Sequence, residues 1–255
     1  MNETNHLDTN QTPLNASTNI KFIDIIFITL CSFGIILFGS FVLLSWANIS
    51  IFDHDVLEDP PLYINVSMAA LEGIALLLSI YIFGIRLRHL NWRDLGLRPT
   101  NYKWILVAIT LVIIFIPIIA VVAIIIQYLL GLPYENPQLD FLLPEQFSWV
   151  GAFGMLVLGG FIVPFAEELF FRGILYQWLK DKAGVWIGII GSSLVFGLLH
   201  GDLPIAGATF VMGIILAWLF ERSNSLWPSI AIHIVNNSLK IVLLYLMTAL
   251  GLSVQ

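Results

Sequence analysis

The sequence predicts an all-α fold, a polytopic transmembrane bundle of about seven helices. Hydrophobic residues make up 58% of the 255-residue chain and charged residues only 11%, whereas a soluble domain carries about 25% charged residues. The mean hydropathy is +0.91, and apolar runs recur that match the roughly 20 helical residues needed to cross a bilayer. A separate soluble domain is therefore excluded. The net charge of −6 gives no sign of nucleic-acid binding, so the expected surroundings are the lipid bilayer.

The predicted elements follow from the chain in order. Residues 1–20 are polar and rich in Asn and Thr, which predicts a disordered N-terminal tail. Seven apolar stretches follow, and each predicts a membrane-embedded helix. They are Phe22–Trp46, Tyr63–Ile85, Trp104–Leu130, Trp149–Leu175, Val185–His200, Pro204–Phe220 and Trp227–Leu250. The fifth and sixth stretches are short and almost adjacent, which predicts a tight helical hairpin. We divide the chain into residues 21–103, with two helices and a basic loop, and residues 104–255, with the other helices.

Charged loops predict the orientation of the bundle. Basic residues fall in three loops that lie on one side if successive helices alternate in direction, and this side should be cytoplasmic. These residues are Arg86, Arg88, Arg93, Arg98 and Lys103, then Lys180 and Lys182, then Arg222. The opposite loops contain Asp53, Asp55, Glu58 and Asp59, then Glu135, Asp140 and Glu145. We therefore expect a multi-pass protein of the cell (plasma) membrane with a cytoplasmic N-terminus.

The fourth stretch contains two adjacent glutamates and an arginine. An ionisable side chain at mid-helix costs ~2.5–3.5 kcal/mol in a membrane and usually serves a function. Glu168 and Arg172 are four residues apart, so they share a helix face and can pair. Glu167 points about 100° away from Glu168, which leaves it free to act on another group. The alternative is that Arg172 marks the cytoplasmic interface and pairs with both glutamates.

The fifth and seventh stretches contain two histidines and an amide. Phe196 and His200 share one face, as do His233 and Asn237. A single buried histidine is more often a core residue than a catalyst, but this combination on three helices favours a functional site. At 1.5 Å per residue, Glu167, His200, His233 and Asn237 lie roughly 16–27 Å from the basic loops, which is compatible with one intramembrane site. Glu72, in the second stretch, is a further carboxylate for which we favour a structural role.

These side chains suit the hydrolysis of an amide bond. Glu167 could take a proton from water while His200 holds and polarises that water. His233 and Asn237 could donate hydrogen bonds to the carbonyl oxygen as an oxyanion hole. In the alternative, Glu167, His200 and His233 bind zinc with an open position for water. The sequence lacks the H-E-x-x-H spacing of soluble zinc proteases, and we favour the interpretation without a metal or other cofactor.

The same residues resemble a known family. Glu167-Glu168-x-x-x-Arg172, Phe196-x-x-x-His200 and His233-x-x-x-Asn237 are similar to the three motifs of the CPBP (also called Abi) intramembrane proteases. That family includes glutamate-dependent CAAX prenyl endopeptidases and bacterial proteins linked to bacteriocin immunity. The segment Trp92–Arg98 also resembles bacterial members, and the resemblance covers about residues 90–250.

The resemblance implies that residues 104–255 form the catalytic core. Glu167 would be the catalytic base and His200 its partner on the water, and His233 and Asn237 would stabilise the oxyanion. Glu168, Arg172 and Phe196 would support these groups. The family has been described both as glutamate-dependent and as metal-dependent, so the resemblance does not decide whether zinc is bound.

We therefore expect an intramembrane endopeptidase, or a metalloendopeptidase if a metal is bound. Its substrate would be a membrane-associated or lipidated, CAAX-like peptide cleaved near the cytoplasmic face. One alternative is a transporter with Glu72, Glu167 and Glu168 as relay carboxylates, although the charges cluster in one half of the chain rather than in two repeats. The other is a non-catalytic membrane protein, for bacteriocin immunity or scaffolding, in which the motifs only hold the fold.

Overall fold

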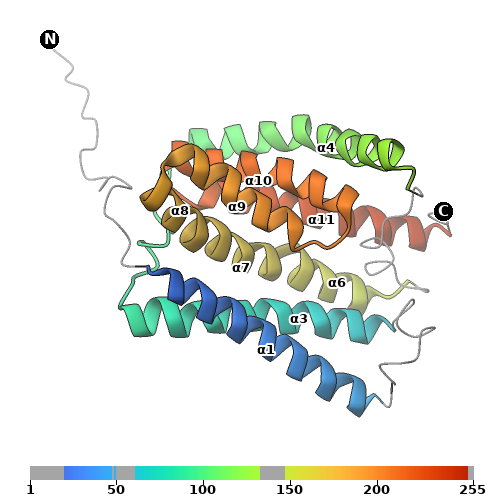
Figure 1. Cartoon of the computed structure of the whole chain (residues 1–255). Coiled ribbons are helices and arrows are strands. Elements are labelled where there is room, and N and C mark those ends of the chain that lie inside the picture. The colour runs from blue at the N-terminus through green and yellow to red at the C-terminus, as the bar shows by residue number, and fades with distance from the viewer. Residues whose placement is uncertain (1–19, 48, 50–60, 133–146, 252–255) are drawn as a thin grey trace, which may run out of the picture.

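A computed structural model describes residues 20–47, 49, 61–132 and 147–251. All regular secondary structure in these residues is helical, as predicted (Figure 1). Six helical segments there are long and apolar enough to cross a membrane, and a shorter apolar helix makes the seventh. The protein is therefore a multi-pass membrane protein. The predicted N-terminal tail, apart from Ile20, and the two acidic loops lie outside the described residues.

The first two helices pack against each other. Helix α1 (Phe22–Trp46) contacts α3 (Leu62–Ser79), which continues into the π-helical segment η1 (Ile80–Arg86). At one end of the pair, the Arg88 guanidinium lies 2.7 Å from the Asp24 carboxylate. This ion pair connects the start of α1 to the chain just after η1.

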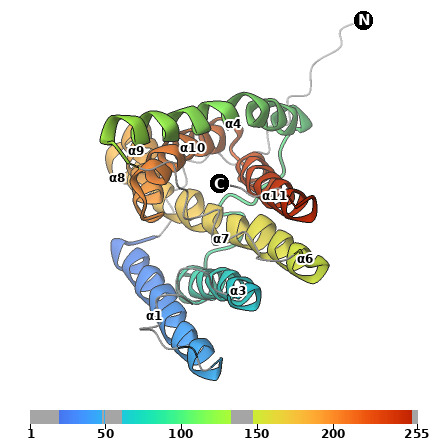
Figure 2. The same ribbon diagram turned by 90° about the vertical axis from the view of Figure 1, so that its right-hand side faces the viewer.

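The fourth predicted helix is one continuous rod built from five segments. They are α6 (Trp149–Val157), η2 (Leu158–Ile162), α7 (Val163–Phe170), η3 (Phe171–Tyr176) and α8 (Gln177–Ala183). η2 and η3 are π-helical, and such turns inside α-helices are frequent at functional sites. The middle of the rod, α7, lies between α3 and α11 (Figure 2).

The rod is longer than the sequence suggested. We expected it to end at Leu175, with Lys180 and Lys182 in a loop, but the helix continues to Ala183 and both lysines occupy its last turn. Cations are favourable near a helix C-terminus because of the helix dipole. Gly184, with φ of +89°, ends the helix. Lys180 also lies 2.6 Å from the Glu221 carboxylate of α10, which holds this last turn against its neighbour.

Helix α4 and the helices that follow the rod form the other side of the bundle (Figures 1 and 2). They are α4 (Tyr102–Leu130), α9 (Val185–Leu198), α10 (Leu203–Ser223) and α11 (Trp227–Ala249). α9 has 14 residues, about 21 Å of helix, so it is shorter than the hydrocarbon core. It forms the predicted hairpin with α10. The two helices approach closely because a Cβ atom at Gly197 would lie 2.5 Å from the Ala206 carbonyl oxygen.

The basic loop before α4 folds against the turn between α10 and α11. The Leu226 N–H donates to the Gly96 carbonyl at 2.8 Å, and the Ser225 hydroxyl donates to the Arg98 carbonyl at 2.6 Å. Gly96 has φ of +99°, and a Cβ atom there would lie 2.5 Å from the Phe220 ring. Only glycine suits this position. The Trp92–Arg98 motif therefore ties the loop to the last two helices.

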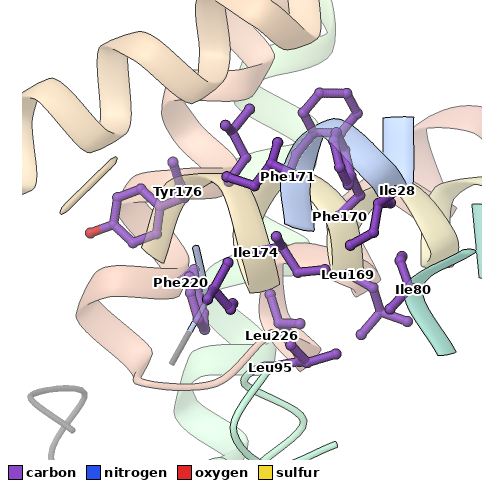
Figure 3. Packing of buried hydrophobic residues seen from close by; sticks show 14 of the residues in the cluster. Ile28, Ile80, Leu95, Leu169, Phe170, Phe171, Ile174, Tyr176, Phe220 and Leu226 are labelled. Atoms are coloured by element: carbon purple, nitrogen blue, oxygen red, sulfur yellow. The ribbon is translucent and has the colours of Figure 1, made fainter. Parts of the chain in front are cut away.

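The main hydrophobic core surrounds α7 and η3. Figure 3 shows its buried side chains, which come from segments far apart in the sequence: Ile28, Ile80, Leu95, Leu169, Phe170, Phe171, Ile174, Tyr176, Phe220 and Leu226. Every residue from Val163 to Tyr176 except Phe165 is buried. The two glutamates of α7 therefore lie in the apolar centre of the bundle.

Candidate active site

Glu168 and Arg172 form the pair that their spacing predicted. Their side chains are fully buried, and Arg172 Nη1 lies 2.7 Å from Glu168 Oε1. Arg172 Nη2 donates to the Gly213 carbonyl at 3.3 Å, and the guanidinium lies 4.6 Å from the centre of the Phe196 ring. A buried ion pair needs such additional contacts to offset the loss of hydration. The pair therefore links η3 to α9 and α10.

His233 of α11 lies between the two glutamates. Its Nδ1 is 2.8 Å from Glu168 Oε1, and its Nε2 is 3.4 Å from Glu167 Oε2. A carboxylate paired with arginine can only accept, so Nδ1 carries the proton and donates to Glu168. In a neutral imidazole the lone pair of Nε2 then faces Glu167. The sequence suggested that Glu167 has no partner, but in the structure His233 is its neighbour.

His200 lies in the turn that follows α9. Its Nδ1 is 2.8 Å from the Phe196 carbonyl oxygen. Since a carbonyl only accepts, Nδ1 donates, and Nε2 of the neutral ring is left as an acceptor. The Phe196 ring packs edge-on against both imidazoles, with centroids 4.8 Å from His200 and 5.7 Å from His233. Phe196 thus contacts both imidazoles.

A cavity of about 490 Å³ opens beside Glu167. Its walls come from α1, α3, the α6–η3 rod, the turn after α9 and α11. Three of the four predicted catalytic residues line it: Glu167, His200 and Asn237. His233 is buried, with 2% of its surface exposed, and lies behind Glu167 rather than in the cavity wall. The structure therefore gathers the predicted residues into one region, with three of them facing a shared space.

The Asn237 side chain is held by two neighbours. Asn236 Nδ2 donates to Asn237 Oδ1 at 3.1 Å, and Asn237 Nδ2 lies 3.5 Å from the Gly159 carbonyl. The amide oxygen is thereby occupied, while the NH₂ group has a second N–H that these contacts do not use. Because Asn237 lines the cavity, this N–H is suited to bind a carbonyl oxygen there. Asn236 was not among the predicted site residues, although it adjoins Asn237.

Two further charged residues line the same cavity, Glu72 of α3 and Lys240 of α11. A structural role was predicted for Glu72, and its side chain belongs to the cavity wall. Lys240 was not among the predicted site residues; it is three residues after Asn237 and therefore on the same helix face. A lysine in the middle of an apolar helix is the signal that could have identified it.

The alternative zinc site does not match the arrangement of the side chains. Among the described residues, no three His, Cys, Asp or Glu side chains come together as a metal-binding group. Glu167, His200 and His233 are therefore not arranged as a zinc ligand set in this structure.

Comparisons with known proteins found matches to the part of the chain that contains this site. The Rce1-like family, described as type II CAAX prenyl endopeptidase, matches residues 149–239. A protein of Bacillus subtilis (strain 168) named "Putative membrane peptidase YdiL" is 28% identical over 89 residues, which are 35% of this chain and 36% of that protein. The matched region is therefore well under half of either chain. No solved structure matches.

Proposed function

We propose that this protein is an intramembrane endopeptidase, because residues 149–239 match the Rce1-like family of type II CAAX prenyl endopeptidases, as the motifs predicted. The observation that supports it best is the cavity that Glu167, His200 and Asn237 share, with His233 directly behind Glu167. A base, a water-holding imidazole and an amide donor around one space are the groups that peptide hydrolysis needs.

In the proposed reaction, a water molecule donates one hydrogen bond to the Glu167 carboxylate and another to His200 Nε2. Glu167 removes a proton as the water oxygen bonds to the peptide carbonyl carbon. The His200 contact to Phe196 fixes the tautomer that can accept from water. The C–N bond then breaks, and the proton held by Glu167 passes to the leaving amine nitrogen.

The contacts favour different roles for Asn237 and His233. Asn237, in the cavity wall, donates its remaining N–H to the carbonyl oxygen as negative charge develops there. His233 has its Nδ1 on Glu168, so it can donate from Nε2 only when it is protonated. We therefore assign His233 to orienting Glu167 and sharing its proton, rather than to the oxyanion hole that the sequence suggested. Glu168 and Arg172 in turn hold His233.

The proposed substrate is a membrane-associated or lipidated peptide. The cavity lies inside the bundle, and α1 contributes Thr29, Ser32, Phe33 and Ile36 to its lining, so it can hold a peptide that has apolar side chains. The basic helix ends, such as the last turn of α8, would face the cytoplasm. We therefore propose cleavage on the cytoplasmic side, with the N-terminus also cytoplasmic.

The test compares Glu167→Gln with a matched control in the same bundle. Glu221→Gln changes a carboxylate that contacts Tyr176 and Lys180 at the basic end and does not line the cavity. Purified proteins in dodecyl maltoside would be incubated with a quenched fluorescent peptide that ends in a farnesylated CAAX sequence, and with its unprenylated form. Size-exclusion profiles and thermal melts would show whether each variant is folded.

We expect Glu167→Gln to lower the cleavage rate by about 10²–10⁴-fold, the usual contribution of a general base, while Glu221→Gln cleaves like the wild type. Wild-type cleavage rates in folded Glu167→Gln would remove the proposed base. Failure of the wild type to cleave either peptide would favour the non-catalytic alternative.

A further inference from the structure

Side chains lining the cavity are graded by exposure. Glu167 is only 9% exposed, His200 and Asn237 are half-buried, and Glu72 and Lys240 are exposed. The proposed base is thus the least exposed of these five side chains, and the two additional charges are the most exposed. They are on different walls, because Glu72 belongs to α3 and Lys240 to α11, with the α7 rod between them.

Lys240 is an unusual residue for its place in the membrane. It lies about 20 Å along α11 from the start of the helix, where a lysine is costly and normally serves a function. No hydrogen bond or ion pair joins its ammonium group to another of the residues that the structure places. The structural contacts that account for Arg172 are therefore missing for Lys240, although its side chain borders the cavity.

We propose that Lys240 binds the free C-terminal carboxylate of the peptide substrate. The inference rests on the proposed peptidase function and adds a determinant of specificity to it. A carboxylate suits a lysine because the ammonium group supplies charge-assisted hydrogen bonds, and these are stronger near a low-dielectric interior than in water.

The position of Lys240 relative to Asn237 supports binding at the end of the substrate. Lys240 follows Asn237 by three residues, about 4.5 Å along the helix axis, and its side chain is the more exposed of the two. A peptide whose reacting carbonyl contacts Asn237 would therefore have its neighbouring residues within reach of Lys240. At roughly 3.3–3.6 Å per residue, the group that meets Lys240 belongs to a nearby part of the same peptide.

Glu72 is a residue of opposite charge on a different wall of the cavity. It lines the same cavity and is also exposed, but its charge would repel a carboxylate. Neutralising Glu72 should therefore leave the preference for a carboxylate in place, whereas neutralising Lys240 should remove it. The two substitutions make a matched pair, because each removes one charge from the lining of one cavity.

The experiment uses two peptides that differ only in ending with a free carboxylate or with an amide. Wild type, Lys240→Met, Lys240→Gln, Lys240→Arg and Glu72→Gln would be assayed in phospholipid-free dodecyl maltoside, with and without added phosphatidylglycerol. Binding would be measured separately by fluorescence anisotropy in the Glu167→Gln background, with and without Lys240→Met, so that recognition is observed without cleavage. Two neutral variants, Lys240→Met and Lys240→Gln, are included so that the test can still be made if one of them does not fold.

We expect the wild type, Lys240→Arg and Glu72→Gln to prefer the carboxylate peptide by about tenfold in KM, and Lys240→Met or Lys240→Gln to treat both peptides alike. Equal cleavage of both peptides by the wild type, or an unchanged preference in the neutral variants, would overturn the carboxylate site and leave the peptidase function standing. A preference that phosphatidylglycerol abolishes would assign Lys240 to a lipid phosphate instead. Lysine-dependent binding without any cleavage would keep the site and remove the proposed function.

Discussion

Arg172→Met tests the electrostatic support beneath the proposed base. The substitution keeps an apolar side chain of similar length against Phe196 but removes the cation 2.7 Å from Glu168. The Glu168 carboxylate, with no exposed surface, would then keep one hydrogen bond, from His233. Removing one partner of a buried ion pair typically costs about 3–5 kcal/mol. We expect a loss of unfolding free energy in this range.

The measurement is reversible unfolding in mixed micelles with increasing SDS, followed by tryptophan fluorescence. Arg222→Met is the control, because Arg222 is exposed at the end of α10 and should cost under about 1 kcal/mol. The double variant Glu168→Gln/Arg172→Met removes both charges, so we expect it to be more stable than Arg172→Met alone. An Arg172→Met cost as small as that of the control, or a double variant equal to the sum of the single ones, would refute this account of the pair.

Two further substitutions test the amide donor and the helical hairpin. Asn237→Ala should lower kcat by about 10²–10³-fold with little change in KM, as expected for an oxyanion donor, and steady-state kinetics with less than a tenfold fall would contradict that role. Gly197→Ala should destabilise the protein by about 1–3 kcal/mol, because the new Cβ atom would lie 2.5 Å from the Ala206 carbonyl oxygen. The loss of stability would be measured by thermal unfolding. Gly34→Ala is the control, because no atom lies within 4 Å of a Cβ atom at that position. Equal stability of the two variants would show that the close approach is unimportant.

The helices were predictable because a bilayer imposes a simple rule. Backbone groups inside hydrocarbon must bond within their own helix, so a long apolar run such as Phe22–Trp46 becomes a helix with those bounds. The rule fails at the ends, where water or protein can satisfy the backbone. The rod from Trp149 therefore continues past Leu175 to Ala183. The predicted division of the chain at residues 103 and 104, and the orientation in the membrane, stay predictions.

The candidate site was predictable only in its local parts. Glu168 and Arg172 lie one turn apart on one helix, so their pairing follows from helix geometry. The approach of His233 to Glu167 joins α11 to α7, and distances along separate helices could not show it. The same holds for Lys240, whose place in the cavity depends on the packing of α11 beside α7 and the position of α1.

The order and spacing of six residues along apolar helices predicted the match to the Rce1-like family and the chemistry that we propose: Glu167, Glu168, Arg172, His200, His233 and Asn237. Spacing sufficed because each pair on one helix has a fixed relation through 3.6 residues per turn. The tertiary structure decided which groups share the cavity, which imidazole nitrogen is already engaged, and where the charges of Glu72 and Lys240 lie. These features depend on how side chains from different helices meet, and the packing of the whole bundle sets that.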